Sequence, residues 1–175
     1  YKTFVGEGMV SLARQALPEG RRDDETVAAW IPRVKEAFRK SWPTKTRPYD
    51  GIPELLDSLA SRGVEIAILS NRPDDLTKLM AGSMLSRWKF SSIHGASDGN
   101  PSKPDPTVAI RIAKDLNLDP GGCLFLGDSN VDMQAAAAAG MHPVGALWGF
   151  RTKEELLAHG AKKLVAHPME LLNLL

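Results

Sequence analysis

The chain of 175 residues has one cysteine, no long hydrophobic run and almost no net charge. A lone cysteine, Cys123, cannot form an internal disulfide, and such sparing use of cysteine is typical of a reducing compartment, which predicts a cytoplasmic location. No apolar stretch approaches the ~20 residues that a membrane-spanning helix needs, so we expect no membrane partner. The net charge of +1, without any basic run, argues against a nucleic-acid partner.

Two sequence patterns meet near residue 48. Residues 1–47 carry apolar residues at helical spacing, among them Phe4, Val5 and Met9, while Pro32 predicts a kink or a later start of the second helix. From residue 48 on, short strands alternate with helices of about ten residues, which is typical of βαβ units and a parallel sheet. We therefore expect an α/β fold, with a doubly wound parallel sheet over 48–175 and a small helical part over 1–47. The expected strands are 64–69, 90–94, 122–126, 141–147 and 163–166, and a helix over 169–175 closes the chain.

One strand runs directly into a pair of acidic residues. The apolar run Leu124–Gly127 is followed by Asp128, and Asp132 comes four positions later at the start of a helix. A carboxylate at the carboxyl end of a buried parallel strand lies where open α/β sheets bind ligands, and two carboxylates on such a turn suit Mg²⁺. The alternative is an ordinary helix cap, which needs no metal. This stretch alone leaves both interpretations open.

Polar residues also follow the other strands. Ser70, Asn71 and Arg72 come after the first strand, and Lys103 precedes the helix between the second and third strands. Because the carboxyl ends of parallel strands share one rim, we expect these side chains to converge with Asp128 on a phosphate-and-metal site. Taken singly, Ser70 or Asn71 is a helix cap, Lys103 is a surface lysine and Arg72 lies at the substrate rim. Their joint placement favours the site.

These motifs carry a family resemblance. Ser70-Asn71, Lys103-Pro104 and Gly127-Asp128-Ser129-x-x-Asp132 resemble the second, third and fourth motifs of the haloacid dehalogenase-like phosphatases. The phosphoglycolate phosphatase branch is most resembled by Ala138-Ala139-Gly140-Met141, Val144 and Trp148-Gly149, and its helical cap is resembled by Val5-Gly6-Glu7-Gly8. The resemblance implies a Rossmann-like core over 48–175, a cap over 1–47, and Mg²⁺-dependent hydrolysis of a small phosphorylated metabolite, such as phosphoglycolate, through an aspartyl phosphate. By this resemblance we expect three catalytic residues, Ser70, Lys103 and Asp128. The substrate is expected to bind to Ser70, Asn71, Arg72 and Lys103. The metal is expected at Asp128 and Asp132, where Asp132 is either a ligand or holds a metal-bound water.

The chain departs from this family at one motif. The family's first motif is an Asp-x-Asp pair at the end of a central strand, and no such pair occurs here. In the family that strand lies between the ones that end here at Leu69 and Leu126, and its first Asp is the nucleophile. Each missing ladder bond would cost about 1 kcal/mol in a buried setting. We therefore expect an upstream segment that was removed, was left out, or is supplied by another chain, consistent with the start at Tyr1 without an initiator methionine.

Two alternative functions stay open. A sugar-phosphate mutase of the β-phosphoglucomutase kind shares the motifs and the cap. A non-catalytic relative that binds phosphorylated ligands or a protein partner is supported by the missing nucleophile alone.

Overall fold

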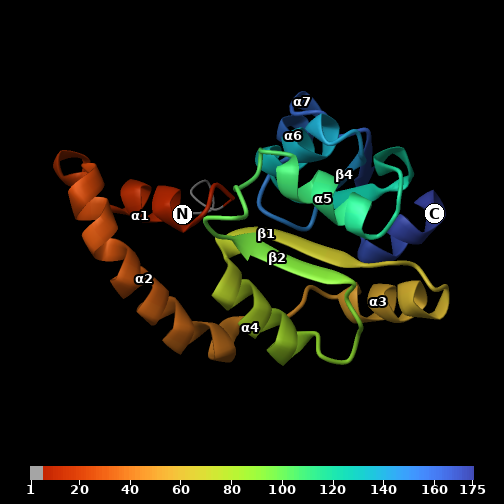
Figure 1. Cartoon of the computed structure of the whole chain (residues 1–175), viewed down its shortest axis with the longest axis horizontal. Coiled ribbons are helices and arrows are strands. Elements are labelled where there is room, and N and C mark those ends of the chain that lie inside the picture. The colour runs from red at the N-terminus through yellow and green to blue at the C-terminus, as the bar shows by residue number, and fades with distance from the viewer. Residues whose placement is uncertain (1–5) are drawn as a thin grey trace.

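The computed structural model describes residues 6–175, which form an α/β body with a pair of helices extending from it (Figure 1). Helices α1 (Met9–Ala16) and α2 (Asp24–Lys45) make up the extension and are joined by a short 3-10 helix, η2 (Glu19–Arg21). The helices expected in this part are present from Met9 on, whereas Phe4 and Val5 lie outside the described residues. Ala13, Leu17 and Val27 give the helical pair an apolar cluster of its own.

Helix α2 passes through two prolines. It begins after Asp23, whose carboxylate accepts a hydrogen bond from the backbone N–H of Thr26 at 2.8 Å. The expected later start near Pro32 is therefore wrong, and the helix also continues through Pro43. A proline inside a helix leaves the carbonyl four residues earlier without its partner. Those carbonyls belong to Ala28 and Arg39, which are exposed, so water can satisfy them.

The strands form two parallel sheets. In one, β1 (Ala67–Pro73) pairs with β2 (Ser92–Ala96). In the other, β4 (His142–Ala146) lies between β3 (Leu124–Gly127) and β5 (Lys163–Val165). These parallel strands confirm the α/β class. The connecting helices are α3 (Ile52–Ser61), α4 (Asp74–Met84), α5 (Thr107–Asp115), η3 (Pro120–Gly122), α6 (Asn130–Ala138) and α7 (Lys153–Ala158). The expected closing helix is present as a 3-10 helix, η4 (Pro168–Leu174).

Strand β1 lies three residues later than the sequence predicts. Its pairing with β2 begins where Ala67 meets Ser92, so residues 64–66 precede the ladder. The strand continues to Pro73 through a register irregularity after Leu69. Ser70, Asn71 and Arg72 therefore belong to the last part of the strand, not to the loop after it.

The two sheets are not hydrogen-bonded to each other. An apolar cavity of about 590 Å³ lies between β1 and β3, with walls that include Leu55, Leu69, Ile112, Phe125 and Leu126. The N–H of Ser91 donates to the carbonyl of Ile66 at 2.8 Å, so that carbonyl faces β2. Because backbone groups alternate between the two sides of a strand, those of Ala67 and Leu69 face the cavity. The inner edges of both sheets thus border this apolar cavity, where the family resemblance predicts a further strand.

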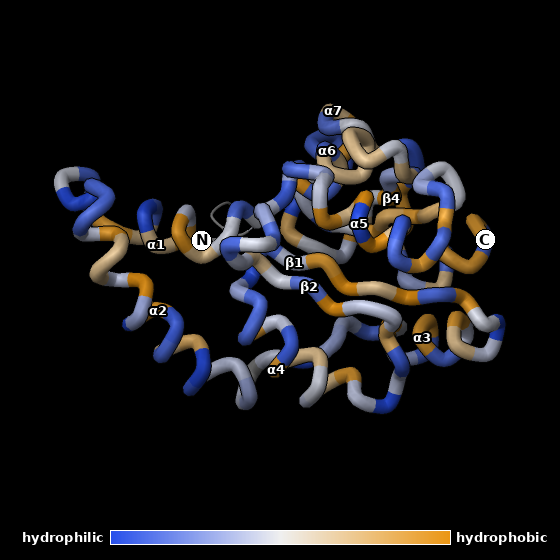
Figure 2. The backbone as a smooth tube through the Cα atoms, in the orientation of Figure 1, coloured by the Kyte–Doolittle hydropathy of each residue, from blue (hydrophilic) through white to orange (hydrophobic). Residues whose placement is uncertain are grey.

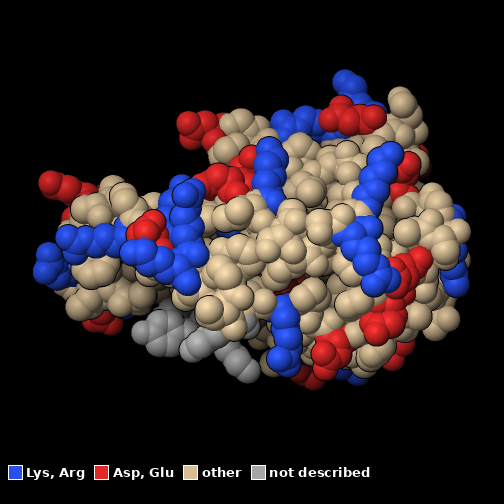
Figure 3. All heavy atoms as spheres, turned by 90° about the horizontal axis from the view of Figure 1, so that it is seen from below, with Lys and Arg blue, Asp and Glu red and all other residues tan. Residues whose placement is uncertain are grey.

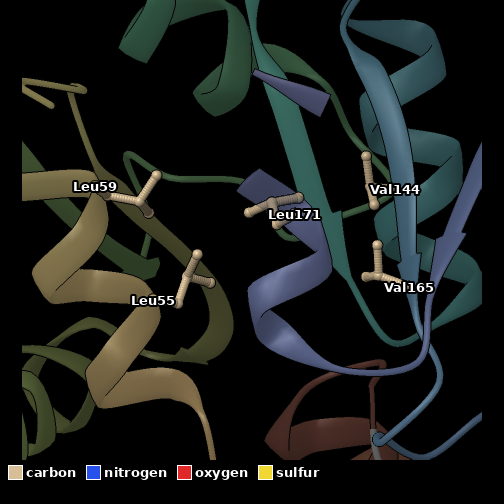
Figure 4. Packing of buried hydrophobic residues seen from close by; sticks show 5 residues of the cluster. All are labelled: Leu55, Leu59, Val144, Val165 and Leu171. Carbon is tan, nitrogen blue, oxygen red and sulfur yellow. The ribbon is translucent and has the colours of Figure 1, made fainter. Parts of the chain in front are cut away.

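Apolar packing holds the remaining elements in place. Leu55 and Leu59 of α3 meet Val144, Val165 and Leu171 from β4, β5 and η4 in the main cluster (Figure 4). Much of β1 is hydrophobic, whereas α2 carries many hydrophilic residues (Figure 2). On the face seen in Figure 3, acidic and basic side chains are interspersed around an uncharged middle. None of the helices within 6–175 is long and apolar enough to cross a membrane.

Candidate active site

A second cavity, of about 280 Å³, lies at the carboxyl ends of β1 and β3. The structure brings together there all six residues singled out in the sequence, although their roles stay predictions. The helical extension supplies the opposite wall. The lining includes Ser70, Asn71, Arg72, Lys103, Asp128 and Asp132 from the α/β body, and Met9, Leu12 and Phe38 from α1 and α2.

Asp128 is a largely buried carboxylate directly after β3. Its Oδ2 accepts a hydrogen bond from the backbone N–H of Phe150 at 3.0 Å. Burial raises the pKa of Asp128 above its usual range, and the nearby negative charge of Asp132 raises it further. Gly149 allows this approach, because a Cβ at that position would overlap the side chain of Asp128. A cation beside Asp128 would offset the cost of its ionisation.

Asp132 uses both of its carboxylate oxygens. Oδ2 accepts hydrogen bonds from the N–H of Asp128 at 3.2 Å, the N–H of Ser129 at 3.0 Å and the hydroxyl of Ser129 at 2.6 Å. Oδ1 lies 2.8 Å from Nζ of Lys103. The capping interpretation of Asp132 therefore holds, and an ion pair is added to it. A direct bond from Asp132 to a metal would compete with Lys103, which favours the role of holding a metal-bound water.

Lys103 is a buried lysine, not a solvated one, with 9% of its side chain exposed. Its ammonium donates to the carbonyl of Leu69 at 2.7 Å and lies 5.8 Å from the centre of the Phe125 ring. A lysine ammonium has three N–H donors, and Leu69 and Asp132 take up two of them. One donor is left for a ligand in the cavity.

Asn71 is buried and holds two neighbouring segments. Its Nδ2 donates to the carbonyls of Gly6 and Lys103, each at 2.9 Å, and its Oδ1 accepts from the N–H of Lys103 at 2.7 Å. An amide nitrogen has two hydrogens, so none is left for a phosphate. The side chain of Asn71 therefore positions Lys103 and the start of the helical extension.

Ser70 and Arg72 differ in the hydrogen-bond donors and charge that they present to the cavity. The hydroxyl oxygen of Ser70 accepts from the N–H of Arg72 at 3.1 Å, which leaves its own O–H able to donate. The guanidinium of Arg72 lies over the Phe38 ring, 5.1 Å from its centre. Burial lowers the pKa of Arg72, which still stays charged at neutral pH.

The sequence did not single out Phe38, Gly149 or Phe150 as site residues. Phe150 acts through its backbone and Phe38 through the approach of α2 to β1, and neither leaves a signal in residue type. Gly8, with a φ of 91°, lies against the carbonyl of Asn71. A Gly-x-Gly at a cap entrance is the one sequence feature that indicates such a close approach.

The chain also matches a known protein family. The family model described as haloacid dehalogenase-like hydrolase matches residues 1–146. The chain belongs to this family.

Several curated relatives of this chain are named as phosphatases. The chain is 28% identical over 154 residues to a phosphoglycolate phosphatase of Xylella fastidiosa, which covers 88% of the chain and 66% of the relative. It is 32% identical over 145 residues to the N-acetylmuramic acid 6-phosphate phosphatase of Pseudomonas aeruginosa. That alignment covers 80% of the chain and 62% of the relative. The crystal structure of a predicted phosphatase from Clostridium acetobutylicum superposes with a TM-score of 0.82 at 26% identity, over 97% of the chain and 77% of that structure. The chain thus spans about two-thirds of the length of these curated relatives.

The donors in this cavity suit part of a Mg²⁺ site. Asp128 offers a desolvated carboxylate, the ligand type that Mg²⁺ prefers. Residues 6–175 contain no group of three acidic, histidine or cysteine side chains placed to hold a metal. Asp128 fits as one ligand, and the others must come from substrate, water or a further segment.

Proposed function

We propose that this chain is the larger part of a Mg²⁺-dependent phosphomonoesterase that acts on a small phosphorylated metabolite. The observation that carries the proposal is the meeting of Ser70, Lys103 and Asp128, from three separate segments, in one cavity of about 280 Å³. A hydroxyl, an ammonium and a metal-suited carboxylate are the groups that a phosphate and its counter-ion need. The phosphatase names of the relatives support the same reaction.

In this proposal each residue of the chain has one task. The O–H of Ser70 and the remaining N–H of Lys103 donate to phosphate oxygens, and Lys103 offsets negative charge in the transition state. Asp128 holds Mg²⁺, which when bound neutralises charge on the phosphate. Asp132 fixes Lys103 and the turn after β3 through contacts of 2.8–3.2 Å and one of 2.6 Å.

The nucleophile in this proposal comes from a strand in the 590 Å³ cavity, between β1 and β3. Such a strand, parallel to its neighbours, would end beside Asp128 with an Asp-x-Asp pair. The first Asp attacks phosphorus, the bond from phosphorus to the ester oxygen breaks, and the leaving alcohol takes a proton from the second Asp. Water then cleaves the aspartyl phosphate and regenerates the carboxylate.

The walls of the active-site cavity limit the size of the substrate. Ligand pockets commonly enclose about 300–1,000 Å³, and this one, at about 280 Å³, lies at the lower limit. Met9, Leu12 and Phe38 close the side opposite the phosphate-binding residues, which supports a division into a cap over 1–47 and a core over 48–175. A short phosphomonoester such as phosphoglycolate fits these limits, and a cytoplasmic location fits such a substrate.

The test uses the extended protein, by which we mean the chain preceded by a strand that ends in Asp-x-Asp. We expect it to hydrolyse para-nitrophenyl phosphate or acetyl phosphate with Mg²⁺ and to lose this activity with EDTA. If neither compound is hydrolysed, the proposal fails and a non-catalytic binder of phosphorylated ligands takes its place. Conversion of one sugar phosphate into an isomer, without release of phosphate, would instead establish a mutase.

A further inference from the structure

One cation in the active-site cavity has no acidic partner among the described residues. The other cation that lines this cavity, Lys103, pairs with Asp132, but Arg72 forms no ion pair within 6–175. Its guanidinium is half-buried, and burial lowers the pKa of Arg72. A partly desolvated cation is costly unless a negative group compensates it. An anionic ligand would supply that compensation.

We propose that Arg72, held by Phe38, binds a carboxylate on the alcohol part of the substrate and so selects phosphomonoesters that carry a second acidic group. The inference rests on the proposed phosphatase function and adds the residue that recognises the leaving group. It differs from a phosphate contact, because Ser70, Lys103 and the cation at Asp128 already serve the phosphate.

The placement of Arg72 suits a short substrate. Ser70 and Arg72 are two residues apart on β1, and a strand rises about 3.3 Å per residue, so their Cα atoms lie within roughly 7 Å of each other. Both line the cavity of about 280 Å³. A phosphate held at Ser70 therefore leaves room for only a short linker before a second group reaches Arg72.

Phe38 helps to orient the guanidinium of Arg72. The guanidinium carbon of Arg72 lies over the ring of Phe38, 5.1 Å from its centre. A contact with the face of a ring takes up no hydrogen-bond acceptor, so the N–H donors of the guanidinium remain available for a planar, two-point contact with a carboxylate. Because Phe38 is on α2 and Arg72 on β1, this recognition site needs the helical extension to lie against the α/β body.

The experiment compares two substrates of similar size in the extended protein. Phosphoglycolate carries a carboxylate, whereas ethyl phosphate has the same two-carbon length without it. A hydrogen bond to a charged group contributes about 1.5–3 kcal/mol, so we expect Arg72→Gln to lower kcat/KM for phosphoglycolate by about 10- to 100-fold. The loss should fall mainly on KM. The value of kcat/KM for ethyl phosphate should change by less than about twofold, because that ester has no carboxylate for Arg72 to bind.

Arg87→Gln is the matched control. The guanidinium carbon of Arg87 also lies over an aromatic ring, 5.0 Å from the centre of Trp88, but Arg87 lies outside the cavity lining. This variant should leave both substrates unaffected. Arg72→Lys keeps the charge but loses the two-point geometry, so it should show a smaller loss that is again confined to phosphoglycolate, and it gives the same comparison if Arg72→Gln does not fold.

Three results would overturn the inference. An equal loss for both substrates at an unchanged melting temperature means that Arg72 binds the phosphate itself. No loss for either substrate means that the Arg72–Phe38 contact only holds the cap. A higher kcat/KM of the wild type for ethyl phosphate than for phosphoglycolate would show that the cavity has no site for a carboxylate. In all three cases the protein still hydrolyses phosphate esters, so the proposed function survives, whereas failure to hydrolyse either ester or the general substrates above rejects that function.

Discussion

The ammonium of Lys103 lies 2.8 Å from a carboxylate oxygen of Asp132, and the two side chains are only 9% and 7% exposed. The same ammonium donates to the carbonyl of Leu69 on β1 at 2.7 Å. Asp132 in turn caps α6, which follows β3. Lys103 therefore joins the two sheets at their carboxyl rim, beside the apolar cavity that separates them. The Lys103–Asp132 ion pair therefore contributes both to the stability of the fold and to the electrostatics of the site.

Breaking this ion pair should destabilise the chain strongly. Removing one partner of a buried pair leaves an uncompensated charge and typically costs about 3–5 kcal/mol. We expect a loss of this size in the free energy of unfolding for Asp132→Asn, measured by urea denaturation. Lys103→Met combined with Asp132→Asn should cost clearly less than the sum of the two single changes. Strict additivity would show that the pair is not coupled.

An exposed ion pair provides the control for that measurement. Glu36 and Lys40 lie 3.3 Å apart on α2, with side chains 59% and 75% exposed. Pairs of this kind contribute about 0–1 kcal/mol. Glu36→Gln should therefore leave the unfolding curve almost unchanged.

The ionisation of Asp128 should oppose folding when no metal is present. Its folded-state pKa is raised above the ordinary value of 3.8 by burial and by Asp132. The stability linked to this group is thus full below the unfolded-state pKa and is lost as the pH rises through the folded-state pKa. Asp128→Asn cannot ionise and can still accept the hydrogen bond of Phe150. With EDTA present we expect the variant to be the more stable protein at pH 7, and the difference should vanish toward pH 3.8.

The stability comparison between Asp128→Asn and the wild type has an outcome that would contradict this prediction. If Asp128→Asn is less stable than the wild type at pH 7, the carboxylate gains more from its neighbours than it loses through burial. Addition of Mg²⁺ should narrow the difference, because the ion stabilises only the protein that has the carboxylate.

Gly149 should tolerate no side chain. A Cβ there would overlap Asp128 and displace its carboxylate. A shift of 1 Å in a catalytic group can cost about 100-fold in rate, so Gly149→Ala should lower Mg²⁺ affinity, measured by calorimetry, and turnover in the extended protein. Gly82 in α4 has open space around it, and Gly82→Ala should instead stabilise the helix by about 0.5–1 kcal/mol without affecting either quantity. Unchanged Mg²⁺ affinity in Gly149→Ala would show that the Asp128 carboxylate keeps its position.

Cys123 reports on the apolar cavity between the sheets. It is half-buried, lines that cavity and is the sole cysteine of the chain. We expect its thiol to react with iodoacetamide in the 175-residue chain and to be protected in the extended protein, where a strand would cover it. Mass spectrometry of the alkylated protein measures both rates. Equal rates would place the added strand elsewhere.

The sequence predicted the convergence of Ser70, Lys103 and Asp128 because the carboxyl ends of parallel strands must share one rim. It did not predict the contact of Phe38 with Arg72, which depends on how α2 lies against β1 across the connection at 46–51. The engagement of Asn71 with Gly6 and Lys103 was missed for the same reason, since its partners are backbone carbonyls whose position only the folded chain defines. The passage of α2 through Pro32 depended on solvent exposure, which residue type alone does not reveal.

The most direct measurement is the Mg²⁺ dependence of phosphate release by the extended protein and its Asp128→Asn variant. We expect the wild type to require Mg²⁺, and the variant to lose at least about 100-fold in turnover because a group that stabilises transition-state charge is gone. Asp119→Asn, outside the cavity lining, should behave as the wild type. Unchanged Mg²⁺ affinity and turnover in Asp128→Asn would contradict the assignment of this carboxylate, and with it the site proposed at the ends of β1 and β3.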